Sequence, residues 1–183
     1  LDPEPSDVFI VAVPTPLNAD KTADMAYVRR ATESIVPHLR RGALVILEST
    51  SPPGTCTDLM RPILERSGLV VGEDIYLAHC PERVLPGRIL KELIENDRVI
   101  GGIDAASAER ARELYATFVE GEIFLTTATT AEMVKLAENT YRDVNIALAN
   151  EMALLCERMQ IDFWEMARFA NRHPRVNIHS AGP

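Results

Sequence analysis

Short, unbroken runs of apolar residues set the strongest limit on how this chain can fold. Residues 8–13 and 43–47 show no polar alternation, and each run ends in a turn that contains proline. Three further runs follow at residues 75–78, 98–102 and 122–125. Strands of this kind are covered on both faces, as in a parallel sheet. Helical patterns over residues 25–39, 57–66 and 106–119 lie between them, so the sequence predicts an open α/β sheet.

The sequence changes character after residue 126. Residues 131–158 contain neither glycine nor proline. Apolar side chains recur there at helical spacing, namely Leu136, Val144, Leu148, Met152 and Leu155. Thr129 followed by Glu132 fits a capping box, which predicts a helix start. Such a helix is about 28 residues or ~42 Å long, and a second one is predicted over 162–171. We therefore expect an α/β part over residues 1–126 and an all-helical part over residues 127–183.

Composition limits what this chain can bind. Lysine and arginine total 19 against 27 aspartate and glutamate, a formal net charge of −8, which argues against nucleic acid or an anionic membrane as partner. No apolar run approaches the roughly 20 residues of a membrane-spanning helix. Cys56, Cys80 and Cys156 are widely spaced, and the histidines show no metal-ligand spacing. We therefore expect a reducing, cytoplasmic setting, no metal, and a local cluster of cations for any anionic ligand.

Candidate binding residues follow the predicted strands. Thr15 follows the first run, Thr50 the second, and Pro-Glu-Arg-Val-Leu-Pro-Gly at 81–87 the third. In open α/β sheets, ligands bind beyond the carboxyl ends of the strands. Residues 52–55 lead into a predicted helix, whose free N–H groups favour an anion. Each segment alone is also typical of an ordinary turn, but their expected gathering at one sheet edge favours a binding site.

The long helix carries a polar ridge. Lys135, Asn139 and Arg142 stand at positions i, i+4 and i+7, on one helix face. A solvated face is the simpler interpretation of this spacing. A ridge that meets the strand-end turns would instead let the lysine stabilise an oxyanion or relay a proton, with the asparagine fixing its geometry. Near the end, His173 and Arg175 flank a proline, which indicates either a helix stop or added contacts for a phosphate or sugar.

Four motifs occur along the chain in a fixed order. They are Val13-Pro14-Thr15-Pro16, Glu48-Ser49-Thr50 with Pro53-Gly54-Thr55, Pro81-Glu82-Arg83 with Pro86-Gly87, and Lys135-x-x-x-Asn139-x-x-Arg142. Together they resemble the UDP-glucose/GDP-mannose dehydrogenase family over nearly the whole chain. Residues 79–87 and 95–102 resemble the branch that oxidises UDP-N-acetyl-D-mannosamine. UDP-glucose dehydrogenases usually carry a second glutamate at the position of Pro86, which disfavours that branch.

The resemblance implies an NAD-dependent oxidation of a UDP-sugar C6 alcohol to the carboxylate, in two hydride transfers and through a cysteine thioester. It implies the second half of a Rossmann-like sheet, followed by a central helical domain that forms a homodimer through its long helix. Roles follow for individual residues. Thr15 and Thr50 would line the NAD site, and Glu82, Arg83 and Val84 would contact the sugar nucleotide. Lys135 and Asn139 would be catalytic with Arg142 beside them, and His173 and Arg175 would reach the substrate within the subunit or across the dimer.

Some parts of the family pattern are missing from this sequence. No G-x-G-x-x-G phosphate loop precedes residue 8, the nucleophilic cysteine would follow residues 182–183, and the UDP-binding third domain is absent. The chain starts at Leu1 and stops at Pro183, so we expect a piece of a longer protein that is inactive alone. The alternatives are a dehydrogenase of UDP-N-acetylglucosamine or UDP-glucose, a β-hydroxyacid dehydrogenase with a similar Lys-x-x-x-Asn pair, and a non-enzymatic dimerisation module.

Overall fold

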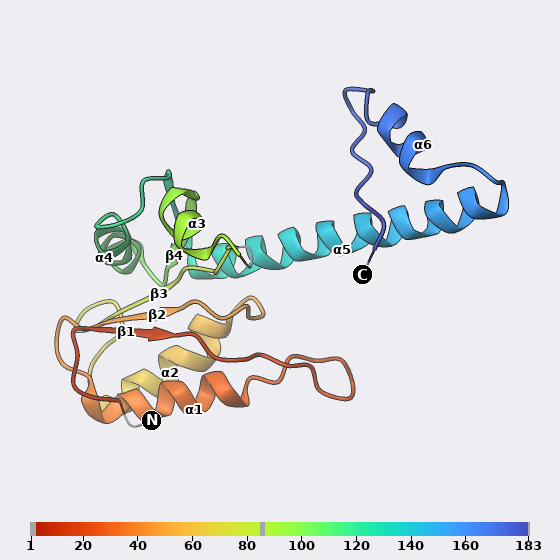
Figure 1. The fold of residues 1–183 in the computed structure, drawn as a ribbon. Helices are drawn as coiled ribbons and strands as arrows, with labels where there is room; N and C mark the ends of the chain where they lie inside the picture. Colours follow the sequence, from red (N-terminus) through yellow and green to blue (C-terminus); the bar gives the residue numbers. More distant parts are fainter. Residues whose placement is uncertain (1–2, 85–86, 183) are drawn as a thin grey trace. The chain divides into compact units, whose positions relative to one another are not determined.

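A five-stranded sheet forms the first part of the chain in the computed structural model, which describes residues 3–84 and 87–182 (Figure 1). The strands are β1 (Val8–Val11), β2 (Leu44–Leu47), β3 (Tyr76–His79), β4 (Arg98–Gly102) and β5 (Ile123–Thr127), and they lie side by side in that order. Each lies on one of the predicted apolar runs. The chain divides into two compact units, Leu1–Leu136 and Ala137–Pro183. The functional division expected near residue 126 stays a prediction.

The sheet is covered on both faces, which explains its unbroken apolar strands. Helix α1 (Ala26–Ile35), the π-helix η2 (Thr55–Met60) and α2 (Arg61–Leu64) pack on one face, and α4 (Ala105–Tyr115) packs on the other (Figure 1). Along β2, Val45 and Leu47 enter the first core, while Leu44 and Ile46 enter the second. All four are buried, and each such side chain contributes about 1.5–3 kcal/mol of hydrophobic stabilisation. The predicted α/β fold is confirmed.

One strand pairing differs from the expected parallel sheet. β1, β2 and β3 are parallel to one another, as are β4 and β5, but β4 runs antiparallel to β3, with Ala78 opposite Gly102. A parallel neighbour requires a crossover packed over one face. The segment between these strands instead contains α3 (Ile89–Glu95), whose seven residues are all described and none of them buried. Because α3 covers no face of the sheet, the chain returns beside β3 in the opposite direction.

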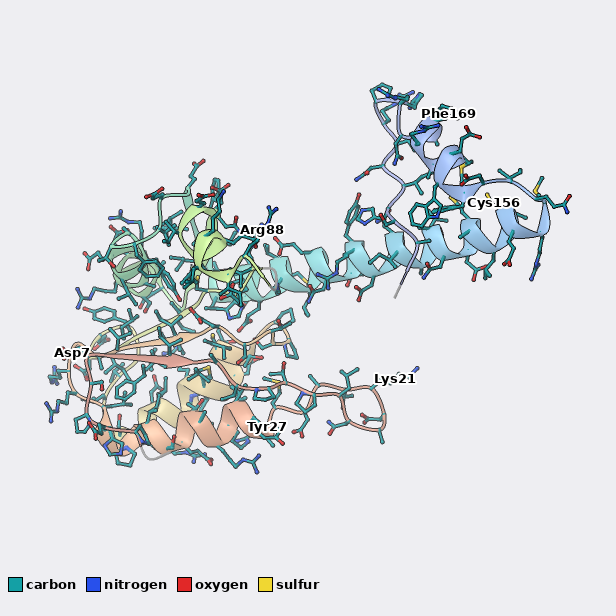
Figure 2. All side chains as sticks on the ribbon, in the orientation of Figure 1. Asp7, Lys21, Tyr27, Arg88, Cys156 and Phe169 are labelled. Atoms are coloured by element: carbon teal, nitrogen blue, oxygen red, sulfur yellow. The ribbon has the colours of Figure 1, made fainter. Side chains whose placement is uncertain are left out.

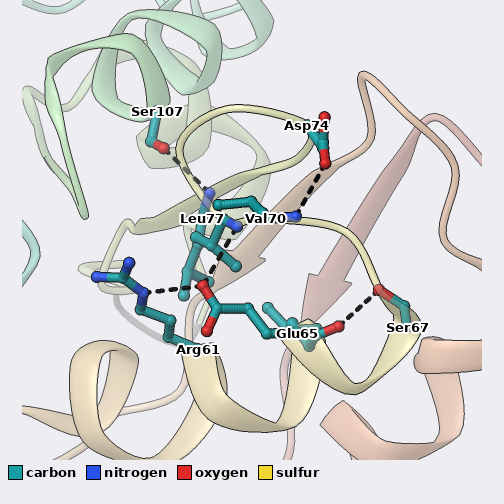
Figure 3. Close-up of polar contacts among 9 residues, drawn as sticks. Arg61, Glu65, Ser67, Val70, Asp74, Leu77 and Ser107 are labelled. Atoms are coloured by element: carbon teal, nitrogen blue, oxygen red, sulfur yellow. Dashed lines mark hydrogen bonds and ion pairs between the residues drawn. The ribbon is translucent and has the colours of Figure 1, made fainter.

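Local hydrogen bonds hold β3 and the turn that precedes it (Figure 3). The Ser107 hydroxyl on α4 accepts the backbone N–H of Leu77 at 3.2 Å, and the N–H of Ser107 donates to the helix-capping Asp104 carboxylate at 2.7 Å. In the turn, the Asp74 carboxylate accepts the N–H of Val70 at 3.0 Å. These contacts fix the position of β3 relative to α4, and with it the segment that follows β3.

The long helix begins earlier than the sequence predicts. Helix α5 (Ala128–Arg158) has 31 residues, and the Thr127 hydroxyl caps it by accepting the N–H of Thr130 at 3.2 Å. The capping box predicted from Thr129 and Glu132 is wrong, because the Glu132 carboxylate bonds to the segment after β2 instead. Short cap patterns describe only sequence neighbours, whereas a buried carboxylate takes whichever N–H groups the fold brings to it.

The second unit contains the rest of α5, the helix α6 (Phe163–Ala170) and an extended tail. Its small core consists of Ala149, Cys156, Phe163 and Ala167, and Figure 2 shows Cys156 on α5 beneath α6. In the tail, the Asn150 side chain pairs with both backbone groups of Gly182, at 2.7 and 2.8 Å. No described helix combines the length and apolar character that crossing a bilayer requires.

Candidate functional site

The segments that follow β1 and β2 are joined by side-chain hydrogen bonds. The Ser49 hydroxyl accepts the backbone N–H of Val13 at 2.8 Å and donates to the carbonyl of the same residue at 2.7 Å. The Thr15 hydroxyl donates to the carbonyl oxygen of Thr50 at 2.8 Å. Because Thr15 and Thr50 are both partly exposed, the two threonines form a small polar surface at the carboxyl ends of neighbouring strands.

The segment after β3 belongs to the same edge of the sheet. The backbone N–H of Glu82 donates to the carbonyl of Glu48 at 3.4 Å. The Glu82 carboxylate accepts the N–H groups of Arg83 and Val84, at 2.6 and 2.8 Å, so it shapes its own turn. The Arg83 guanidinium donates to the carbonyl of Asp97 at 3.1 Å. The three turns that the sequence placed at one edge are therefore observed together there.

Lys135 reaches this edge from the first turns of α5. Its ammonium donates a hydrogen bond to the backbone carbonyl of Glu82, and the side chain is partly buried. The contact lies within the first unit, which extends to Leu136. A fully solvated face does not require such a contact, and the functional role of Lys135 stays a prediction. Lysine can act there as a proton carrier and as a positive charge beside a developing oxyanion.

The other predicted site residues lie in the second unit. The Arg142 guanidinium donates to the side-chain oxygen of Asn139 at 3.2 Å and pairs with Asp143 at 3.5 Å. His173 and Arg175 are exposed in the tail after α6, where the N–H of Arg175 donates to Nδ1 of His173 at 3.3 Å. Pro86, the residue that distinguishes the family branches, lies outside the described residues. The roles of these residues stay predictions.

The backbone N–H groups after β2, which were expected to bind an external anion, already donate to a carboxylate of the same chain. The Glu132 carboxylate accepts the N–H of Gly54 at 2.6 Å and the N–H of Cys56 at 2.8 Å. Glu132 is completely buried, and this burial raises the pKa of its carboxyl while the two N–H groups oppose the rise. The expectation that this helix end holds an external anion is therefore wrong, because an internal carboxylate complements its N–H groups.

A buried polar cluster that the sequence did not reveal lies near these turns. The Tyr115 hydroxyl donates to the Glu48 carboxylate at 2.5 Å, and the buried Arg98 guanidinium lies 5.5 Å from the Tyr115 ring centre. Burial raises the pKa of the Cys80 thiol to about 11, and burial followed by the Glu132 charge raises the pKa of the Cys56 thiol. Both thiols are thus protonated at neutral pH, as packing residues rather than nucleophiles.

His79 ends β3 and is completely buried. Among the described residues, neither of its ring nitrogens has a hydrogen-bond partner. Burial lowers the pKa of this imidazole to about 4, so the ring is neutral at pH 7. Within the described residues, no group of three or more histidine, cysteine, aspartate or glutamate side chains could hold a metal ion.

Comparison with protein families identifies both parts of the chain. Residues 2–119 match the NAD binding domain of the UDP-glucose/GDP-mannose dehydrogenase family, and residues 129–183 match the central domain of that family. The UDP-N-acetyl-D-mannosamine dehydrogenase of Methanocaldococcus jannaschii is 58% identical, over 99% of this chain and 42% of that protein. The NDP-N-acetyl-D-galactosaminuronic acid dehydrogenase of Ralstonia solanacearum is 51% identical, over 100% of this chain and 45% of that protein.

Comparison with a solved structure agrees with this family assignment. The UDP-D-ManNAc dehydrogenase of Pyrococcus horikoshii superposes with a TM-score of 0.93 and 54% identity, over 98% of this chain and 43% of that one. The chain therefore spans less than half the length of the relatives it matches.

Proposed function

Because this chain belongs to the UDP-glucose/GDP-mannose dehydrogenase family, we propose that it is part of an NAD-dependent UDP-N-acetyl-D-mannosamine 6-dehydrogenase. The whole enzyme would oxidise the C6 alcohol of the sugar to a carboxylate in two hydride transfers. The motif at residues 79–87 and relatives of that name at 50–58% identity support this substrate. Since the chain covers less than half of those relatives, it is expected to be inactive alone.

The observation that carries the proposal is the hydrogen bond from the Lys135 ammonium to the Glu82 carbonyl. It brings a cation to the turn that the resemblance assigns to the sugar nucleotide. Oxidation of an alcohol needs its proton removed while negative charge grows on the oxygen. A lysine at this position stabilises that charge and passes the proton on. Asn139 is proposed to orient the same oxygen, with Arg142 beside it.

NAD is the cofactor of this family, and the residues at the sheet edge fit part of its site. NAD accepts the hydride when it is bound. Thr15 and Thr50 offer partly exposed polar groups at the carboxyl ends of β1 and β2, where dinucleotides bind in open α/β sheets. The helix end after β2 is taken by Glu132. We therefore assign the two threonines to the NAD site and assign its pyrophosphate to a loop outside this sequence.

The remaining assignments concern the substrate. Arg83 and Val84 follow Glu82, whose carboxylate bonds both of their N–H groups and so fixes the turn. We propose that this turn contacts the nucleotide sugar, and that the exposed His173 and Arg175 add polar contacts to it. An acidic chain with a net charge of −8 needs such local cations to hold a diphosphate.

We further propose a homodimer that forms through α5, and a division of roles near residue 126. Val144, Leu148 and Leu155 on α5 are 61%, 50% and 55% exposed, although their spacing is that of a buried helix face. Contiguous apolar exposure of this kind is typical of an interface. A cytoplasmic location is part of the proposal, because Cys56, Cys80 and Cys156 are all unpaired.

The test uses the full-length enzyme from the parent reading frame. Purified enzyme with UDP-N-acetyl-D-mannosamine and NAD should form two NADH for each uronate, measured by absorbance and by mass spectrometry of the product. UDP-glucose, UDP-N-acetylglucosamine and a small β-hydroxyacid serve as competing substrates. Preferential turnover of any of these three would replace the proposed substrate, and no NAD reduction with any sugar would contradict the proposed activity.

A further inference from the structure

We propose that Glu132 is a positioning residue, whose carboxylate ties the loop after β2 to the first turns of α5 and thereby places the Lys135 ammonium. The catalytic meaning of this tie rests on the proposed function. The tie itself rests on contacts within the first unit alone.

The Glu132 carboxylate is held at both of its oxygens. Oε2 accepts the N–H of Gly54 and Oε1 accepts the N–H of Cys56, across sequence separations of 78 and 76 residues. The side chain is completely buried. A buried carboxylate is tolerated only when strong donors compensate it, and two N–H groups at a helix start supply that compensation. Two bonds to separate atoms fix the orientation of the group as well as its distance.

Glu132 and Lys135 are three residues apart, so their side chains leave α5 on neighbouring positions of one face. The glutamate bonds the segment after β2, and the lysine bonds the segment after β3. The helix is therefore fastened at two adjacent strand ends. The Lys135 side chain projects outward from the axis of α5. A rotation of the helix about that axis would therefore move the ammonium away from the Glu82 carbonyl. The rigid glutamate contact opposes that rotation.

A third contact holds the same part of the helix. Ala131 is completely buried, and a Cβ atom placed on Gly101 of β4 would lie only 2.7 Å from the Ala131 Cβ. The helix thus lies directly on the sheet one residue before Glu132. Packing at Ala131 sets the height of α5 above the sheet, and the carboxylate sets its rotation.

Substitutions separate this role from a general effect on stability. Glu132→Gln keeps the size of the side chain but turns an NH2 group toward one of the two N–H donors. Glu132→Asp keeps the charge but shortens the side chain by one methylene group, so the carboxylate no longer reaches both N–H groups. Thr127→Val is the matched control, because it removes the cap at the same end of α5 without touching the loop after β2.

The experiment compares these variants in the full-length enzyme. For Glu132→Gln we expect kcat to fall about tenfold to a hundredfold, as a displacement near 1 Å at a reacting centre does, with KM for both substrates nearly unchanged. Labelling of Lys135 by acetic anhydride, followed by mass spectrometry, should change in rate by several fold. Thr127→Val should lower the melting temperature and leave kcat and Lys135 labelling as in the parent enzyme. For Glu132→Asp we expect kcat and the rate of Lys135 labelling to change at least as much as in Glu132→Gln, because a shortened carboxylate loses both N–H partners.

Other outcomes overturn the inference. A folded Glu132→Gln or Glu132→Asp enzyme with parental kcat and parental Lys135 labelling would make Glu132 a purely structural residue. So would a Thr127→Val enzyme that loses kcat in the same proportion as Glu132→Gln. If the parent enzyme fails to oxidise the UDP-sugar, the proposed function fails, while Lys135 labelling in the variants still decides whether Glu132 places the lysine.

Discussion

The Lys135 ammonium donates to the backbone carbonyl of Glu82. A carbonyl dipole orients an amine without cancelling its positive charge. Such an arrangement suits a group that must meet negative charge on a substrate oxygen. The nearby carboxylate of Glu132 is instead directed to two N–H groups on another segment.

This reasoning predicts the effect of removing the amine. In the full-length enzyme, Lys135→Ala should lower kcat by about 10²–10³ and leave KM nearly unchanged, because the lost charge acts mainly in the transition state. Steady-state kinetics with UDP-sugar and NAD measure both constants. Lys91→Ala, which removes an exposed amine paired with Glu95 at 3.5 Å, is the control and should behave as the parent enzyme. An undiminished kcat in Lys135→Ala would restore the interpretation of a solvated ridge.

His79 predicts how stability depends on pH. Its folded pKa is about 4, while an unfolded imidazole titrates near 6.5. Between about pH 4 and pH 6.5, the unfolded chain therefore binds a proton on His79 that the folded chain does not bind. The contribution of the neutral imidazole to the free energy of unfolding is complete above pH 7 and is lost as the pH falls from 6.5 toward 4. The loss should reach about 3 kcal/mol.

Urea unfolding at pH 7 and pH 4.5 measures this loss. His79→Leu should reduce the pH dependence in that interval, since leucine fills the buried site without titrating. His173→Leu changes an exposed histidine and should retain the full dependence. Equal pH slopes in the parent and in His79→Leu would show that another group is responsible.

At this scale, local signals in the sequence predicted where some residues lie, whereas contacts with distant partners were missed. Thr15, Thr50 and Lys135 were expected at one edge of the sheet because they follow strands or belong to a motif, and they lie there, while their functional roles stay predictions. Glu132 was interpreted as a cap for its own helix, because its partners lie 76 and 78 residues away. His79 belongs to the motif at residues 79–87, but nothing in the sequence states that its imidazole will be completely buried.

Among the elements, β2 and β4 show what periodicity can predict and what it cannot. The unbroken run in β2 predicted a strand buried on both faces, and all of its residues are buried. The run in β4 was equally apolar, but an apolar pattern carries no information about direction. The direction was decided by α3, which buries none of its seven described residues, so the chain did not cross over the sheet.

Gly101 on β4 lies close to the start of the long helix. A Cβ atom there would lie 2.3 Å from the Thr127 carbonyl oxygen and 2.7 Å from the Ala131 Cβ. Gly101→Ala should therefore push the start of α5 outward and destabilise the protein by about 1–3 kcal/mol, the usual range for overpacking. Chemical denaturation measures the loss, and Lys135 labelling should change with it. A variant with parental stability would mean that the contact relaxes without cost.

For the whole molecule, the sequence predicted the order of an α/β part and a helical part, but not which apolar residues of α5 are covered. Leu136, Val144, Leu148, Met152 and Leu155 have the spacing of a core face, yet Val144, Leu148 and Leu155 remain at least half exposed. The described core of the second unit takes from α5 the buried Ala149 and Cys156 and the partly buried Met152 and Ala153, and it leaves Val144, Leu148 and Leu155 largely uncovered. Periodicity identifies an apolar face and leaves open whether the same chain covers it.

The surplus apolar surface predicts self-association. Phe169 and Trp164 on α6 are 60% and 59% exposed, which adds large apolar side chains to those of α5. Covering Leu148 in a dimer would contribute about 1–2 kcal/mol for that residue alone. The full-length protein should therefore sediment as a dimer, and Leu148→Glu should shift it toward monomer by placing a charge in the apolar contact.

Sedimentation velocity over a hundredfold range of protein concentration tests this expectation. Glu113→Gln alters an exposed side chain of α4 that pairs with Arg110 at 2.8 Å, and it should leave the dimer intact. Glu113→Gln changes the net charge by one unit in the opposite direction to Leu148→Glu, so it shows only whether the dimer responds to a single surface charge. A parent protein that stays monomeric at the highest concentration would exclude the dimer, and a dimer that tolerates Leu148→Glu would place its interface away from this part of α5.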